Sequence, residues 1–139
     1  MRKAGWEQRL AQAIDARRRT PFGPWGAYDC VVFAGECVDA LTGVNPAAQF
    51  VGQYGDAKTA LVVLSKLGFA SLEAWLDANF PEVAPASAQR GDLALLTDEA
   101  AEGLFGALGV FCGQSIAAPG EKGLHFLGRA AARKAYGVR

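Results

Sequence analysis

The chain has 139 residues, 51% of them hydrophobic and 20% charged, and its 14 Lys and Arg residues balance its 14 Asp and Glu residues. This length and apolar content are typical of one globular domain, so we expect a single domain over residues 1–139. The balanced charge gives no reason to expect a nucleic-acid partner. No apolar run approaches the roughly 20 residues of a membrane-spanning helix. The charged, mixed segment after Met1-Arg2-Lys3 is unlike a secretory signal peptide.

The first 80 residues show helical periodicity, with apolar residues recurring at intervals of three and four. A rigid turn at Thr20-Pro21-Phe22-Gly23-Pro24 separates an N-terminal helix (1–20) from a longer helical part (21–80). Capping residues before the apolar runs and glycines after them mark the helix ends. The predicted helices span residues 4–19, 29–42, 56–67 and 72–79.

The pattern changes after a Pro- and Ala-rich connector at residues 81–89, which we expect to be moderately flexible. The part from 90 to 139 alternates short apolar runs with hairpin signals such as Gly113 and Pro119-Gly120. Helices followed by short antiparallel strands predict an α+β fold, with N-terminal helices packed on a small antiparallel β-sheet. The predicted elements here are strands at 91–96, 107–112, 114–118 and 123–127, and a short helix at 129–135.

Residues 24–33 contain the most informative motif of the chain. Asp29 is predicted to cap a helix that begins at Cys30. That position places Cys30 in the first helical turn, where free backbone N–H groups and the helix dipole favour a thiolate. Cys30 is therefore a candidate nucleophile. The alternative is a structural cysteine, because Cys30 shares an apolar stripe with Ala34 and Cys37 and buried cysteines act as small hydrophobes.

The remaining cysteines and the histidine content give no sign of a cofactor or a metal. The chain has three cysteines, and an odd number without a signal peptide argues against a disulfide framework. One histidine and no Cys-x-x-Cys pair argue against a structural zinc site. We expect Cys37 and Cys112 to lie in the core.

Four short motifs resemble, in order, those of the NlpC-type cysteine peptidases, papain-like enzymes that cut peptidoglycan peptides. Asp29-Cys30-Val31-Val32-Phe33 resembles the Asp-Cys-Ser-Gly-Phe that begins the nucleophile helix of that family, and Gly91-Asp92-Leu93 matches its Gly-Asp-Leu strand. Leu108-Gly109-Val110-Phe111-Cys112-Gly113 follows its His-Val-Gly-Ile-Tyr-Leu-Gly strand, and Ile116-Ala117-Ala118-Pro119 follows its Ile-His-Ala-Pro strand.

The resemblance covers residues 21–120 and implies a papain-like fold with Cys30 at the nucleophile position. The chain is also similar to small proteins of unassigned function encoded in phage tail modules. However, the family's base histidine falls at Ala107 and its third polar residue at Ala117. A thiolate that attacks an amide needs a base to activate the thiol and later to protonate the leaving amine, and alanine can do neither. Val31-Val32 in place of Ser-Gly also crowds the approach of a substrate backbone.

His125 is the only histidine and thus the one alternative base. Strand alternation points it away from Leu124 and Phe126, which we expect to face the core. His125 is therefore expected at the surface or at a layer boundary. Asp92, placed directly before a strand, is expected to be a turn residue and not a group that orients a base.

Aromatic residues surround the predicted start of the Cys30 helix. Trp25 and Tyr28, next to Asp29, either line a peptide groove or pack against the helix start. Trp6, Phe22 and Trp25 are candidates for an apolar surface that partner proteins would bury.

These observations lead to one main hypothesis and two alternatives. The main hypothesis is a non-catalytic NlpC-like domain that serves as a structural or binding component of a phage or phage-derived tail, near the tail tip. Its partners would be other tail proteins, with peptidoglycan as a further candidate, and its location the virion after cytoplasmic assembly. The first alternative is a cysteine hydrolase of peptidoglycan peptides with Cys30 as nucleophile and His125 as base. The second is a thiol acyl-transfer or regulatory protein that uses Cys30 without a histidine.

Overall fold

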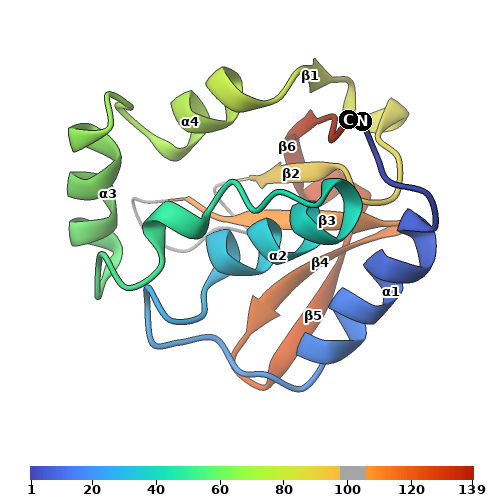
Figure 1. Cartoon of the computed structure of the whole chain (residues 1–139), viewed down its shortest axis with the longest axis horizontal. Coiled ribbons are helices and arrows are strands. Elements are labelled where there is room, and N and C mark those ends of the chain that lie inside the picture. Colours follow the sequence, from blue (N-terminus) through green and yellow to red (C-terminus); the bar gives the residue numbers. More distant parts are fainter. Residues whose placement is uncertain (98–105) are drawn as a thin grey trace.

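The computed structural model describes residues 1–97 and 106–139, and the first part of the chain is helical (Figure 1). Each predicted helix is confirmed to within two residues at either end. No helix among the described residues is long and apolar enough to cross a membrane. The helices are α1 (Trp6–Arg17), α2 (Cys30–Thr42), α3 (Ala57–Lys66) and α4 (Leu72–Asn79), with a 3₁₀ turn, η1 (Ala48–Phe50), between α2 and α3.

Short-range hydrogen bonds explain why three of these helices begin where the sequence predicts. The Asp29 carboxylate accepts from the first turn of α2, and the Ser71 hydroxyl accepts from Ala74 N at the start of α4. Asp56 and Thr59 form a reciprocal capping box at α3. Because each cap lies within three residues of its partner, the sequence alone was sufficient to locate it.

The second part of the chain forms a sheet that contains six antiparallel strands among the described residues. Its spatial order is β1-β6-β2-β3-β4-β5. The α+β class is thereby confirmed, and the four predicted strands correspond to β2 through β5. The strands are β1 (Glu82–Val83), β2 (Leu93–Leu96), β3 (Leu108–Cys112), β4 (Ser115–Gly120), β5 (Gly123–Gly128) and β6 (Ala132–Tyr136).

The predicted helix at 129–135 is wrong. Arg129–Ala131 forms a 3₁₀ turn, η3, and β6 follows it directly. β6 lies between β1 and β2, where Leu93 pairs with Tyr136 and Ala94 with Ala135. The backbone of the buried strand β2 needs hydrogen-bond partners on both sides, and this requirement outweighs the helix propensity of the alanines in this segment.

The connector at 81–89 is held against the sheet, contrary to the expected flexibility. It contains β1 and a second 3₁₀ turn, η2 (Pro85–Ser87). Arg129 Nη2 donates to the carbonyls of Pro85 and Ala88 at 2.7 and 3.1 Å. The same guanidinium lies 4.7 Å from the ring centroid of Phe111.

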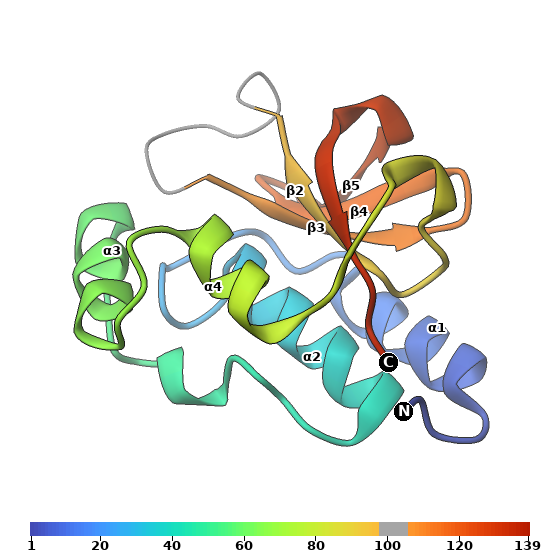
Figure 2. The ribbon, with the colours of Figure 1, turned by 90° about the horizontal axis from the view of Figure 1, so that it is seen from above.

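The central strands β2, β3 and β4 are buried on both faces of the sheet. Figure 2 shows α1, α2 and α4 together on one side of the sheet. Strand alternation divides the inward side chains into two clusters. Cys30 and Cys37 pack on the helix side, which confirms Cys37 as a core residue, and Cys112 packs partly buried against the same cluster. The strand residues on the helix side are Leu93, Leu95, Leu108, Val110, Ala117 and Tyr136, and those on the opposite face are Ala94, Leu96, Phe111, Ile116, Ala118 and Ala135.

The two chain ends lie side by side (Figures 1 and 2), and the buried carboxylate of Asp92 joins them. Its Oδ1 accepts from Arg2 Nη2 at 2.9 Å, from Arg139 Nη1 at 3.0 Å and from Val138 N at 3.1 Å. Its Oδ2 accepts from Gln89 N at 2.8 Å in the turn before β2. Asp92 is thus a turn residue, as predicted, and in addition an ionic clamp on both termini.

Candidate functional site

A cavity of about 700 Å³ opens where the start of α2 meets the end of the sheet. This volume is in the range of small-ligand sites. The cavity brings together segments that the sequence places far apart, and it runs past the sheet end, where β2 stops and β3 begins. Its walls come from the turn before α2 (Phe22 and Trp25), the first residue of α2 (Cys30), the end of β2 (Leu96), the start of β3 (106–108) and the β4–β5 hairpin (118–125).

Asp29 caps α2 directly before Cys30, the α2 residue that lines the cavity. Its Oδ1 accepts from Val31 N and Val32 N, both at 3.0 Å. Its Oδ2 accepts from Gly26 N at 2.9 Å and from the Tyr54 hydroxyl at 2.7 Å. Four neutral donors therefore satisfy a carboxylate that is only 1% exposed. They fix the first turn of α2 both to the preceding turn and to the loop before α3.

Gly26 makes this arrangement sterically possible. Its φ is +83°, and a Cβ at this position would lie 2.1 Å from the carbonyl oxygen of Tyr54. Next to it, Trp25 contacts Phe22 and Tyr54 edge-on, with ring centroids 5.4 and 6.4 Å apart. The three rings thus form a continuous contact from Phe22 in the cavity wall to Tyr54, whose hydroxyl donates to Asp29.

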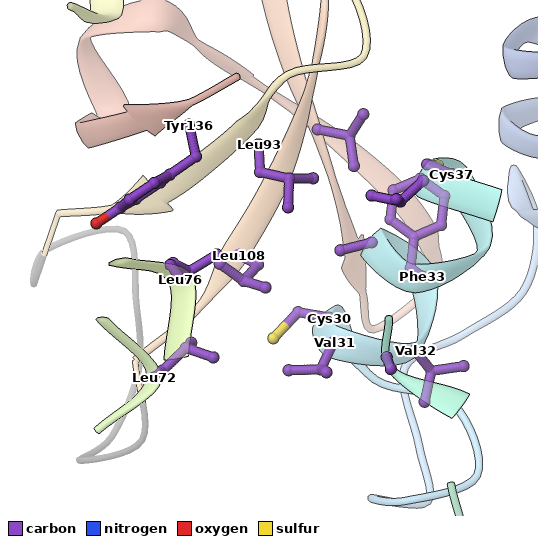
Figure 3. Packing of buried hydrophobic residues seen from close by; sticks show 14 of the residues in the cluster. Cys30, Val31, Val32, Phe33, Cys37, Leu72, Leu76, Leu93, Leu108 and Tyr136 are labelled. Carbon is purple, nitrogen blue, oxygen red and sulfur yellow. The ribbon is translucent and has the colours of Figure 1, made fainter. Parts of the chain in front are cut away.

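Cys30 lines the cavity, but its thiol is poorly suited to act as a nucleophile. The residue is 5% exposed, and Figure 3 shows its sulfur pointing from α2 toward the side of Leu76 and Leu108. Burial raises the pKa of the thiol to about 12, in spite of backbone N–H groups at Leu108, Cys30 and Val31 that favour the thiolate. Because desolvation outweighs the helix terminus, the thiol is protonated near pH 7, contrary to the sequence-based expectation of a thiolate.

The two alanines at the base positions of the motif lie in different surroundings. Ala107 lines the cavity and directly precedes Leu108, whose N–H reaches the Cys30 sulfur. Ala117 does not line the cavity; it pairs with Val110 and is fully buried on the helix side of the sheet. Of the two positions, therefore, only 107 shares the cavity with Cys30, and alanine there offers no base.

His125 lines the same cavity from β5, but from the other face of the sheet. It pairs with Ala118, which belongs to the cluster on the face away from the helices, whereas Cys30 packs on the helix side. His125 is exposed, as predicted. The expectation that Phe126 faces the core is wrong: its side chain is 44% exposed, with the Arg18 guanidinium 5.5 Å from its ring.

The aromatic groove candidates separate into two groups. Phe22 and Trp25 border the cavity. Tyr28 is buried instead in the core against α2. Trp6 lies near the chain ends, with the Arg2 guanidinium 4.3 Å from its ring, so it takes no part in this site.

Two contributors to the site were not predicted from the sequence. Tyr54 lies 25 residues beyond the carboxylate that its hydroxyl contacts, and no local pattern marks it. Glu121 and Lys122 line the cavity from the turn between β4 and β5, and both are exposed.

Within residues 1–97 and 106–139, no group of three or more His, Cys, Asp or Glu side chains is placed to hold a metal ion. The cavity combines an apolar interior around Leu108 with a polar mouth.

Comparison with known protein families gives a match over almost the whole chain. The family model described as "Domain of unknown function (DUF6950)" matches residues 1–138. No curated protein matches the chain. The matched range includes Asp29, Asp92 and every described residue of the cavity.

Proposed function

The chain belongs to the family described as a domain of unknown function (DUF6950), and from this premise we propose that it is a non-catalytic, NlpC-like binding or structural domain. The proposal rests on the chemistry of two residues that line the cavity, Cys30 and Ala107. Cys30 is buried and its thiol is protonated, and Ala107, which stands at the base position of the resembled motif, lines the same cavity and offers no base. A cysteine hydrolase needs a thiolate and a base within about 3 Å of the proton that it takes. The open cavity itself supports a binding role.

The setting that we propose is a phage or phage-derived tail, near its tip. The support is the resemblance of the Asp29-Cys30 helix start to its counterparts in phage-encoded and NlpC-type proteins. The proposed partners are other tail proteins, with peptidoglycan as a further candidate, and the proposed location is the virion after cytoplasmic assembly. Mass spectrometry of purified tail particles tests this, and absence of the protein from intact particles would contradict it.

The competing function is a cysteine hydrolase in which Cys30 and His125 act together. The observation in its favour is that both residues line one cavity. Against it, the two side chains lie on opposite faces of the sheet. The second alternative, thiol chemistry at Cys30 without a histidine, also requires a reactive thiolate.

The decisive experiment measures peptide hydrolysis and thiol reactivity in the same preparation. We expect no release of peptidoglycan stem-peptide fragments above buffer, either from the native protein or from Cys30→Ser. With the pKa moved from 9.0 to about 12, the thiolate fraction at pH 7 falls about 1000-fold, so iodoacetamide should label Cys30 far more slowly in the folded than in the unfolded chain. Peptide mapping distinguishes Cys30 from the partly buried Cys112. Turnover that disappears in a folded Cys30→Ser variant would refute the proposal.

A gain-of-function pair tests the role of position 107. Ala107→His should bring an imidazole next to the Cys30 sulfur, and we expect faster iodoacetamide labelling of Cys30 than in the native protein. Ala117→His is the matched control, because Ala117 is fully buried away from the cavity. That variant should lose stability without a specific increase in Cys30 labelling. Equal increases in both folded variants would show that position 107 has no special relation to the thiol.

A further inference from the structure

We draw no further inference here: the strongest candidate, the outer edge of strand β5 around the exposed Phe126, lies at one side of the sheet, and nothing in the described part of the chain shows what covers it.

Discussion

Two buried carboxylates, Asp92 and Asp29, lie at opposite ends of this molecule, and different kinds of hydrogen-bond donor stabilise their negative charges. Asp92, beside the chain termini, accepts from two guanidinium groups, those of Arg2 and Arg139, as well as from backbone N–H groups. Among the described residues, the donors to Asp29, beside the cavity, are all neutral: three backbone N–H groups and the Tyr54 hydroxyl. Both side chains are almost completely buried.

The difference shows what each end of the domain is built to do. The Asp92 clamp brings full charges together and joins segments from both ends of the chain. Asp29 and its four neutral donors, which we call the Asp29 hub, contain dipolar N–H and O–H groups in place of cations. The hub fixes the conformation of the first turn of α2. Its negative charge also contributes to the raised pKa of the adjacent Cys30. The residue that constructs the apparent nucleophile helix therefore opposes formation of the thiolate.

Removing the ionic clamp should have the largest effect. Asp92→Ala leaves the largely buried Arg2 guanidinium, 10% exposed in its side chain, without its carboxylate, and leaves Val138 N and Gln89 N without an acceptor. We expect the free energy of unfolding to fall by about 3 kcal/mol or more, as measured by urea denaturation at pH 7. Asp15→Ala is the control, because its pair with Arg18 is exposed and should contribute less than about 0.5 kcal/mol. Similar losses in the two variants would show that burial adds nothing to the clamp.

Removing the Asp29 hub should cause the next largest loss in the free energy of unfolding. Asp29→Ala deletes the α2 cap, at a cost of about 1–2 kcal/mol. It also leaves Gly26 N and the Tyr54 hydroxyl unpaired, so we expect a total loss of about 2–3 kcal/mol in urea denaturation. Asn at this position retains one acceptor oxygen and should lose less. If Asp29→Ala cost more than Asp92→Ala, the ranking of the two carboxylates would be reversed.

The raised pKa of Cys30 predicts a loss of stability at alkaline pH. Above pH 9 the unfolded chain releases the Cys30 proton while the folded chain keeps it up to about pH 12. The unfolded state then binds fewer protons, so the free energy of unfolding falls by up to about 1.4 kcal/mol per pH unit from this group. Burial also raises the pKa of Cys37, which acts in the same direction. Unfolding followed between pH 8 and 10.5 should show a shallower decline in Cys30→Ser, and an unchanged slope would contradict the assignment.

The smallest expected effect comes from single hydroxyl groups. Tyr54→Phe removes one hydrogen bond to Asp29 and should cost about 1 kcal/mol. Tyr136→Phe removes an equivalent 2.7 Å hydrogen bond to Asp77, away from the cavity, and is the matched control. Only Tyr54→Phe loosens the first turn of α2, so it alone should speed iodoacetamide labelling of Cys30. Equal labelling rates in the two variants would show that the hub does not control access to the thiol.

Features with short-range causes could be predicted from the sequence. The caps at Asp29 and Ser71 bond to atoms two or three residues away, and the hairpin signals mark the turns around β4. The helical part followed by a β-rich part was enough to give the α+β class. β6 could not be predicted in this way, because its strand conformation comes from pairing with β2 about 40 residues earlier, and not from its own composition.

By itself, therefore, the sequence determined where the helices begin, which residues alternate in the strands, and that Asp29 precedes Cys30 at a helix start. Only the tertiary structure decided that the Cys30 thiol stays protonated, that His125 lies across the sheet from it, and that Asp92 joins both termini. The physical reason is the range of the interactions. Caps and periodicity depend on neighbours along the chain, whereas desolvation, strand register and ion pairing depend on segments that meet only after folding.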